Sequence, residues 1–293
     1  MSGPTRPTGL PAYVALAFLI SWGWLVPVVL TGGEVVSGVG WPTHVPALLG
    51  PMAAALLVSA VTGGRAALRD LWHRMVLVRV PLRWWAVGLS PVFLLLTVAA
   101  AAAMGWTSLD VAGLARFPGV PSAWGAVGVV AAVVLVNGFG EETGWRGYVQ
   151  PALQRRHSPL VATMGVAVIW AAWHLPMFFA LASFRSFGPV TLVGWCIGLL
   201  SGAVVLAWLY NRSGGSILLV AMWHAGYNLV SATAIGAGFL GAASTVLVIL
   251  GATVLVVLEL VRTRSGRSSV LLPEARTGVT AGRRTEQGDS CDT

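Results

Sequence analysis

The residues that could do chemistry gather in three short stretches of an otherwise apolar sequence: 137–146, 170–176 and 224–228. They supply carboxylates, imidazoles and a carboxamide, which are groups that activate water and stabilise an oxyanion in hydrolytic enzymes. A charged group inside a bilayer costs roughly 2.5–3.5 kcal/mol on insertion scales, so each of these groups needs a reason to be there.

Two adjacent glutamates have different expected roles. Glu142 and Arg146 are four residues apart with the acid first, the favourable order for an intrahelical ion pair. Glu142 is therefore either a supporting residue or a group that only neutralises charge. Glu141 projects about 100° away from that pair on a helix, and an unpaired carboxylate in apolar surroundings is suited to act as a general base. The alternative is an interfacial carboxylate that faces water.

The second stretch contains His174, two residues before Pro176. Proline lacks an amide donor, so we expect it to free the Ala172 carbonyl and kink the helix. An imidazole beside a free carbonyl could hold an ordered water, with Trp170 and Trp173 shielding it on either side. The alternative is a structural histidine.

In the third stretch, His224 and Asn228 are four residues apart and project from one face of a helix. They could donate two hydrogen bonds to an oxyanion; the alternative is a polar pair that joins two helices. Together the stretches indicate a mechanism in which Glu141 deprotonates a water with help from His174. His224 and Asn228 would then stabilise the oxyanion formed on a peptide carbonyl.

Long apolar segments must position these side chains. Apolar residues make up 56% of the 293 residues, charged residues only 10%, and the mean hydropathy is +0.80, whereas soluble domains carry about 25% charged residues. The stretches that are long enough to cross about 30 Å of hydrocarbon are 10–31, 43–63, 84–104, 123–142, 159–182, 189–210, 214–235 and 238–261. The predicted fold is an all-α polytopic membrane helix bundle of about eight transmembrane helices.

The distribution of arginine predicts the orientation. The loops after the first, third, fifth and seventh stretches contain only Arg116 and Arg185, and the other arginines lie in the remaining loops and near the termini, apart from Arg146 beside the glutamates. The positive-inside rule then places both termini in the cytoplasm. Because the net charge of +8 is spread between apolar spans, it does not indicate nucleic-acid binding. All 18 basic residues are Arg, a bias that suggests a GC-rich bacterial genome. With the apolar spans, it leads us to expect a multi-pass protein of a bacterial inner (plasma) membrane.

The sequence divides into regions along these lines. We expect a three-span region at 1–122 with a basic amphipathic helix at 65–83 on the inner leaflet, a core at 123–235, a last helix at 236–261 and a disordered tail at 262–293. Three histidines outside the polar stretches are interpreted as ordinary surface residues of loops: His44, His73 and His157.

The depths of the two site histidines must match if they share a site. At 1.5 Å per residue, His174 would lie roughly 24 Å into its span and His224 about 15 Å into its own. An extra helix within 148–157 could supply the offset.

The three motifs, in this order, resemble those of the CPBP family, which includes the type II CAAX prenyl proteases, also called the Abi family, and bacteriocin-processing or immunity proteins. The residues that carry the resemblance are Glu141-Glu142-x-x-x-Arg146, Trp170-x-x-x-His174 and His224-x-x-x-Asn228. The resemblance covers about 123–232. Trp170 is a departure, because the family usually has Phe there.

The resemblance implies an eight-helix intramembrane glutamic endopeptidase whose cavity opens toward the cytoplasmic leaflet. It implies a catalytic set of Glu141, His174, His224 and Asn228. Glu142 and Arg146 of the first motif would support this set. The implied partner is a membrane-anchored peptide or protein substrate in the lipid bilayer.

A metal is the first open alternative. Glu141, His174 and His224 would make a two-histidine, one-glutamate set like that of catalytic zinc sites. The sequence has no H-E-x-x-H, however, and Asn228 would be a poor fourth ligand. We therefore favour a metal-independent mechanism with no cofactor, with zinc as the alternative.

Two other classes of function remain open. A transporter also carries ionisable residues within broken helices, but it predicts paired interruptions in both halves, whereas the polar residues here lie in the second half. A non-catalytic bacteriocin-immunity protein predicts that Glu141→Ala leaves the phenotype intact.

Overall fold

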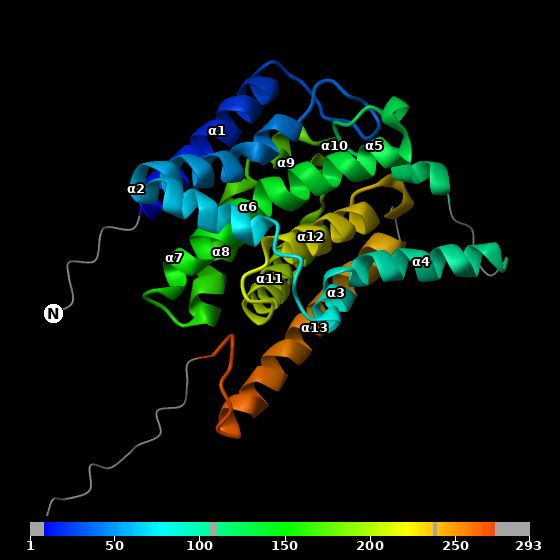
Figure 1. The fold of residues 1–293 in the computed structure, drawn as a ribbon. Coiled ribbons are helices and arrows are strands. Elements are labelled where there is room, and N and C mark those ends of the chain that lie inside the picture. Colours follow the sequence, from blue (N-terminus) through cyan, green and yellow to red (C-terminus); the bar gives the residue numbers. More distant parts are fainter. Residues whose placement is uncertain (1–8, 106–109, 237–238, 273–293) are drawn as a thin grey trace, which may run out of the picture.

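Figure 1 shows the computed structural model of the chain, which describes residues 9–105, 110–236 and 239–272. Within these residues the chain folds into a bundle of helices, and the extended pairings are two isolated bridges, Val35 with Leu181 and Ser37 with Pro118. The predicted all-α class is therefore confirmed.

Each predicted apolar stretch forms helix. The helices are α1 (Leu10–Leu30), α2 (Gly50–Met75), α3 (Leu82–Gly88), α4 (Ser90–Ala103), α5 (Gly125–Ala132), α6 (Glu142–Gly144), α7 (Gln150–Gln154), α8 (Pro159–Trp173), α9 (Met177–Ala180), α10 (Ala182–Arg185), α11 (Pro189–Arg212), α12 (Ile217–Ser231) and α13 (Phe239–Arg264). Among the described residues, six helical segments are long and apolar enough to cross a membrane, or seven if the bent pair α3–α4 is one span. The one remaining predicted span, 214–235, corresponds to the shorter α12.

The seventh predicted stretch, 214–235, contains a helix of only 15 residues. Gly214 and Gly215 adopt φ of +72° and +86°, a left-handed conformation that suits glycine and ends a preceding helix. Ser216 then caps α12 by accepting a hydrogen bond from the Leu219 amide. The turn and its cap consume the first residues of the predicted span.

The second helix is longer than predicted and is broken. Gly64 has φ +60° and ψ −150°, which glycine adopts without a steric penalty, so α2 changes direction there and continues to Met75. The predicted amphipathic helix at 65–83 is therefore shorter than expected. The β-branched Val76, Val78 and Val80, followed by Pro81, disfavour helix over residues 76–81.

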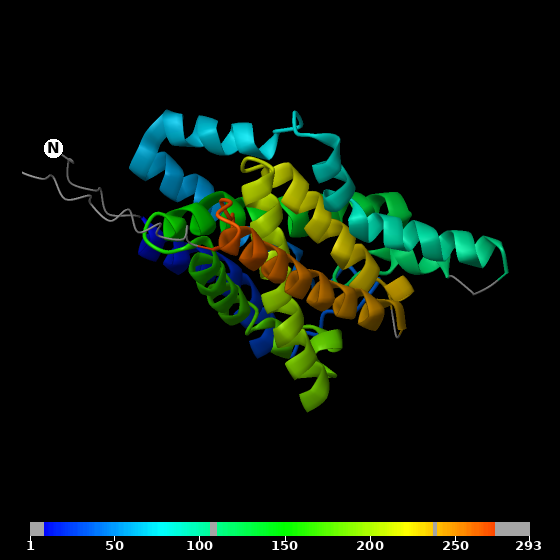
Figure 2. The same ribbon diagram turned by 90° about the horizontal axis from the view of Figure 1, so that it is seen from below.

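Helix α12 lies at the centre of the bundle. It packs against the long helical segment 122–154, α4, α11 and α13. Figure 2 shows α13 crossing α11 and running alongside α12. Most of its side chains are buried, including Trp223 and His224. A polar side chain on α12 is therefore presented to several other helices at once.

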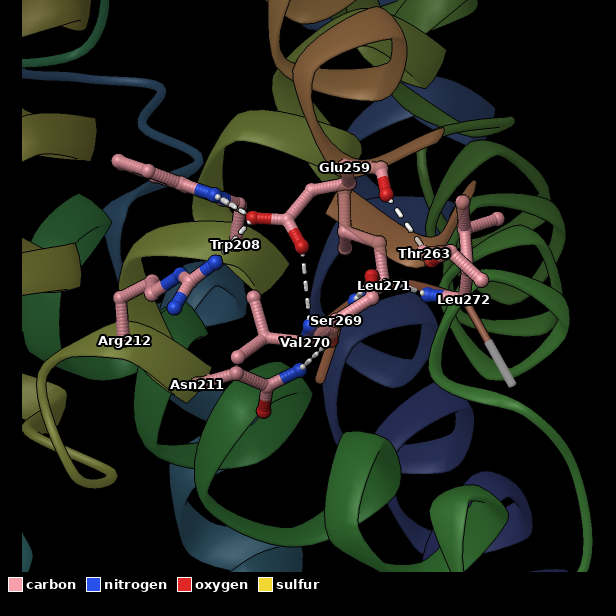
Figure 3. A network of polar contacts seen from close by, with 9 residues as sticks. All are labelled: Trp208, Asn211, Arg212, Glu259, Thr263, Ser269, Val270, Leu271 and Leu272. Carbon is pink, nitrogen blue, oxygen red and sulfur yellow. Dashed lines mark hydrogen bonds and ion pairs between the residues drawn. The ribbon is translucent and has the colours of Figure 1, made fainter. Parts of the chain in front are cut away.

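The chain after α13 turns back onto the bundle (Figure 3). The Val270 amide donates to Glu259 Oε2 at 3.1 Å, Asn211 donates to the Val270 carbonyl at 2.9 Å, and the Leu160 amide donates to the Leu271 carbonyl at 2.7 Å. The prediction of a disordered tail from residue 262 is therefore wrong for 262–272. Hydrogen bonds to Glu259, to Asn211 and to the Leu160 amide hold this segment against the bundle. Residues 273–293 lie outside the described part.

Candidate active site

Both glutamates lie in the long helical segment 122–154, which is not a regular α-helix. The turns Val133–Glu141 (η4) and Trp145–Val149 (η5) are π-helical, and the short α6 lies between them. A π-helical turn widens the backbone and is frequent at functional sites. Here Glu141 is the last residue of η4, and Glu142 is the first residue of α6. The continuation through η5 and α7 supplies the extra helix expected within 148–157.

Glu141 points toward α8. Its side chain is 2% exposed, and its Oε2 accepts a hydrogen bond of 2.8 Å from the indole Nε1 of Trp170. The other carboxylate oxygen, Oε1, has no hydrogen-bond partner among the described residues and is not fully enclosed. One oxygen is therefore held in place, and the other is free to meet a water.

Glu142 forms the expected pair with Arg146. Glu142 Oε1 lies 3.0 Å from Arg146 Nη1, and both side chains are fully buried. The same oxygen lies 2.8 Å from Nδ1 of His224, a contact that the sequence did not predict because it joins residues 82 positions apart. Glu142 therefore connects the segment 122–154 to α12.

His174 ends α8, and its ring is fixed by the backbone. Nδ1 lies 2.7 Å from the Trp170 carbonyl, so Nδ1 carries the proton and Nε2 has a free lone pair. The predicted free carbonyl of Ala172 is wrong: it accepts a hydrogen bond from the Leu175 amide at 3.1 Å. The chain tightens into a turn before Pro176 and so satisfies that oxygen.

Aromatic rings surround His174. The expected neighbours Trp170 and Trp173 have ring centroids 5.6 and 5.0 Å from the imidazole. Two further rings, Phe184 at 6.4 Å and Trp195 at 5.3 Å, come from α10 and α11 and were not predicted. This apolar surrounding limits the access of bulk water to the imidazole.

Trp170 lies against three of the four predicted catalytic residues: Glu141, His174 and His224. Besides its contacts with Glu141 and His174, its ring lies 5.4 Å from the ring of His224, and the Arg146 guanidinium lies 5.0 Å over it. The sequence had indicated Trp170 as a shield and as the aromatic residue of the second motif, but not as a donor to Glu141. Its position four residues before His174, on the same helix face, was the available signal.

Asn228 lies one turn after His224 on α12. Its side chain is partly buried and makes no hydrogen bond to another described residue. His224 uses Nδ1 for Glu142, which leaves Nε2 for another partner. The structure thus brings Glu141, His174 and His224 around Trp170, with Asn228 on the same helix as His224.

Tyr13 of α1 is a neighbour of this site that the sequence did not indicate. It is fully buried, and its ring stacks on Tyr148 at 4.9 Å and meets Trp145 edge-on at 6.1 Å. A Cβ on Gly144 would lie 2.3 Å from the Tyr13 hydroxyl and 2.6 Å from Pro51 Cβ. Glycine after the two glutamates therefore allows α1 and α2 to approach them.

His44 is not the surface residue that the sequence suggested. It immediately precedes the membrane-length segment Val45–Met75, is 3% exposed, and stacks on Phe117 with ring centroids 6.4 Å apart. Burial, with a smaller contribution from the charge of His174, lowers the pKa of His44 to about 4. His73 and His157, in contrast, are exposed as predicted.

The zinc alternative requires three ligands in one place. Among residues 9–105, 110–236 and 239–272, no three His, Cys, Asp or Glu side chains are grouped to hold a metal ion. Trp170 donates its indole N–H to Glu141 Oε2, and its carbonyl accepts from His174 Nδ1. Zinc stays the alternative prediction.

Comparison with known proteins agrees with the motifs. Residues 123–230 match the family described as type II CAAX prenyl endopeptidase Rce1-like. The chain is also 30% identical, over 93 residues, to CAAX prenyl protease 2 of Methanococcus maripaludis; the match covers 30% of this chain and 34% of that protein. The chain thus spans about a third of the length of the curated relative it matches. Residues 123–230, which carry all three motifs, are thus similar to this family of endopeptidases.

Proposed function

We propose that this protein is an intramembrane endopeptidase that hydrolyses peptide bonds of membrane-anchored substrates with a glutamate-activated water. The observation that carries the proposal is the grouping of Glu141, His174 and His224 around Trp170. It is supported by the family of segment 123–230 and by the name of the relative, a CAAX prenyl protease.

The first step forms a bond between water and the peptide carbonyl. A water donates one hydrogen bond to Glu141 Oε1 and another to His174 Nε2. Glu141 takes a proton as the water oxygen attacks the carbonyl carbon. His224, protonated on both nitrogens, donates from Nε2 to the resulting oxyanion, and the Asn228 amide donates a second hydrogen bond.

The second step breaks the carbon–nitrogen bond. The tetrahedral intermediate collapses, and the proton held by Glu141 passes to the leaving nitrogen. The remaining water proton, on the new carboxyl group, also passes to the amine, so the products are a carboxylate and an ammonium group and one water is consumed for each bond. Glu142 and Arg146 support this step by fixing His224 through its Nδ1.

The substrate is a peptide or protein tail that reaches the site from the cytoplasmic leaflet. The membrane is the inner membrane of a bacterium, and both termini of the chain lie in the cytoplasm. Six or seven membrane-length helices among the described residues support a multi-pass arrangement.

The test uses the purified full chain in detergent with a prenylated fluorogenic peptide and an unprenylated peptide library. Wild type is compared with Glu141→Ala and His224→Ala, each with and without a chelator. We expect cleavage by the wild type that resists the chelator, and its loss in both variants. Asn228→Ala should reduce the rate by about 10²–10³, the usual effect of removing one oxyanion donor.

Other results would contradict the proposal in defined ways. Loss of cleavage with chelator and recovery with added zinc would replace the glutamate mechanism with a metal mechanism. Cleavage that persists in both Glu141→Ala and His224→Ala would remove the site assignment. A folded wild type that cleaves neither substrate class would favour a non-catalytic role.

A further inference from the structure

A polar cavity lies away from the glutamate site. It has a volume of about 560 Å³, within the range of about 300–1,000 Å³ typical of small-molecule pockets. It lies between the start of α1, the second half of α2, the segment η5–α7 and the end of α11. Its polar side chains are Ser59, Thr62, Asp70, Arg74, Tyr148, Arg155 and Tyr210. None of the proposed catalytic residues lines it.

Arg74 is held rigidly in the wall of this cavity. Its guanidinium donates to Asp70 Oδ2, with Nη2 at 2.8 Å, to the Gly147 carbonyl at 2.9 Å and to the Tyr210 hydroxyl at 2.8 Å. These three contacts come from α2, the segment η5–α7 and α11. The Arg74 guanidinium is therefore fixed in position, unlike that of a flexible surface arginine.

Hydrogen-bond donors remain available inside the cavity. Tyr210 accepts from Arg74 and so keeps its own O–H for another partner. The Tyr148 hydroxyl and the Arg155 guanidinium make no hydrogen bond or ion pair with other described residues. With Arg74 and Arg155 against Asp70, the lining has a net positive charge. This chemistry fits an anion with several acceptor oxygens, such as a phosphoryl group.

The surroundings favour a lipid as the source of that anion. Val61 and Trp72 of α2, beside the lining residues, are 86% and 62% exposed, as expected where a helix meets acyl chains and the interface. Arg65, Arg69 and Arg156 are also exposed at this end of the bundle, where α1 starts and α7 lies (Figure 1). Basic pockets between membrane helices on the cytoplasmic side bind anionic headgroups.

We infer that this cavity binds the phosphoryl headgroup of an anionic phospholipid, with Arg155, Tyr148 and Tyr210 donating to the phosphate oxygens. The adjacent arginines Arg155 and Arg156 provide a matched pair of variants. Both are exposed, but only Arg155 lines the cavity. Tyr148→Phe removes a hydroxyl and keeps the ring that stacks on Tyr13.

The test is native mass spectrometry of the full chain in detergent, titrated with phosphatidylglycerol. Phosphatidylcholine, glycerol phosphate and inorganic phosphate are titrated in parallel. We expect one tight phosphatidylglycerol per chain, binding weakened tenfold or more by Arg155→Gln, severalfold by Tyr148→Phe and less than twofold by Arg156→Gln. If Arg155→Gln does not fold, Tyr148→Phe against Arg156→Gln decides the question.

Three results would overturn the inference. Equal weakening by Arg155→Gln and Arg156→Gln would mean that bulk charge attracts the lipid. Binding of glycerol phosphate or inorganic phosphate as tight as that of the lipid would mean that the ligand is a soluble anion. Displacement of the lipid by a peptide with a free carboxylate, but not by its amide, would assign the cavity to a peptide.

Discussion

Glu141 and Glu142 are neighbours in sequence but lie in different surroundings. Glu141 has one oxygen free, whereas Glu142 is enclosed with Arg146 and His224. We expect Glu141→Gln to abolish cleavage with little change in stability. Glu142→Gln should also destabilise the fold by about 3–5 kcal/mol, because a buried Arg146 loses its counter-charge. Cleavage rates and unfolding midpoints of the two variants check this.

The double variant Glu142→Gln/Arg146→Met provides the control. It removes both charges and leaves no uncompensated ion, so most of the lost stability should return. Activity should remain low, because His224 has still lost its carboxylate partner. Equal stability losses in Glu141→Gln and Glu142→Gln would contradict the different assignments.

His44 gives the fold a pH dependence. Its pKa of about 4 in the folded chain lies below the unfolded value of about 6.5, so the unfolded chain binds more protons between these values. Stability should therefore fall as pH decreases from 6.5 to 4, by at most ~3 kcal/mol from this group. His44→Gln should flatten the pH dependence of the unfolding midpoint in that window.

Exposed His73 is the matched control for this measurement. His73→Gln should leave the pH dependence as in the wild type. The hypothesis fails if His44→Gln keeps the full acid sensitivity.

At the residue scale, intrahelical relations were predictable and long-range ones were not. The Glu142–Arg146 pair follows from a spacing of four. The contact of Glu142 with His224, the indole donor to Glu141 and the burial of His44 depend on which helices become neighbours. Spacing within one segment carries no information about that arrangement.

At the scale of elements, the close approach of α1 and α2 to α6 depends on Gly144. A Cβ there would lie 2.3 Å from the Tyr13 hydroxyl and 2.8 Å from the Pro51 carbonyl carbon. Since backbone cannot move easily, we expect Gly144→Ala to cost about 1–3 kcal/mol or more and to reduce activity. Thermal unfolding followed by tryptophan fluorescence measures the cost.

Gly251 in α13 offers the comparison, because a Cβ there meets nothing within 4 Å. Gly251→Ala should be neutral or stabilising by up to about 1 kcal/mol through helix propensity. If both substitutions have the same effect, the packing explanation for Gly144 is incorrect.

The apolar stretches predicted every long element because length and hydropathy are local properties. The deviations all arise from backbone details. Gly64 breaks α2, Gly214 and Gly215 shorten α12, and two π-helical turns reshape the segment 122–154. The folded segment after α13 was missed because its polar composition resembles that of a disordered tail, whereas its contacts come from Glu259 and Asn211.

At the scale of the whole molecule, charge indicates orientation. Arg116 and Arg185, which the sequence assigns to the outer side, each pair with an acid, Asp110 and Glu34 respectively. Both pairs are exposed and add little stability, but they neutralise the positive charge of that side. The opposite side keeps exposed arginines such as Arg156.

Reporter fusions test this orientation. A green fluorescent protein fused after residue 293 should fluoresce in the cytoplasm, and alkaline phosphatase inserted in the loop after α1 should be active outside. The reverse pattern at either position would contradict the placement of both termini in the cytoplasm.

The Glu142–Arg146 ion pair also has a consequence for biogenesis. Because both partners belong to one helical segment, they enter the translocon together and can neutralise each other before any later helix is synthesised. An ion pair between two helices would leave the first charged residue in the lipid without its partner until the second helix is inserted. Glu142 and Arg146 thus enter the bilayer as a compensated pair, and His224 joins them 82 residues after Glu142.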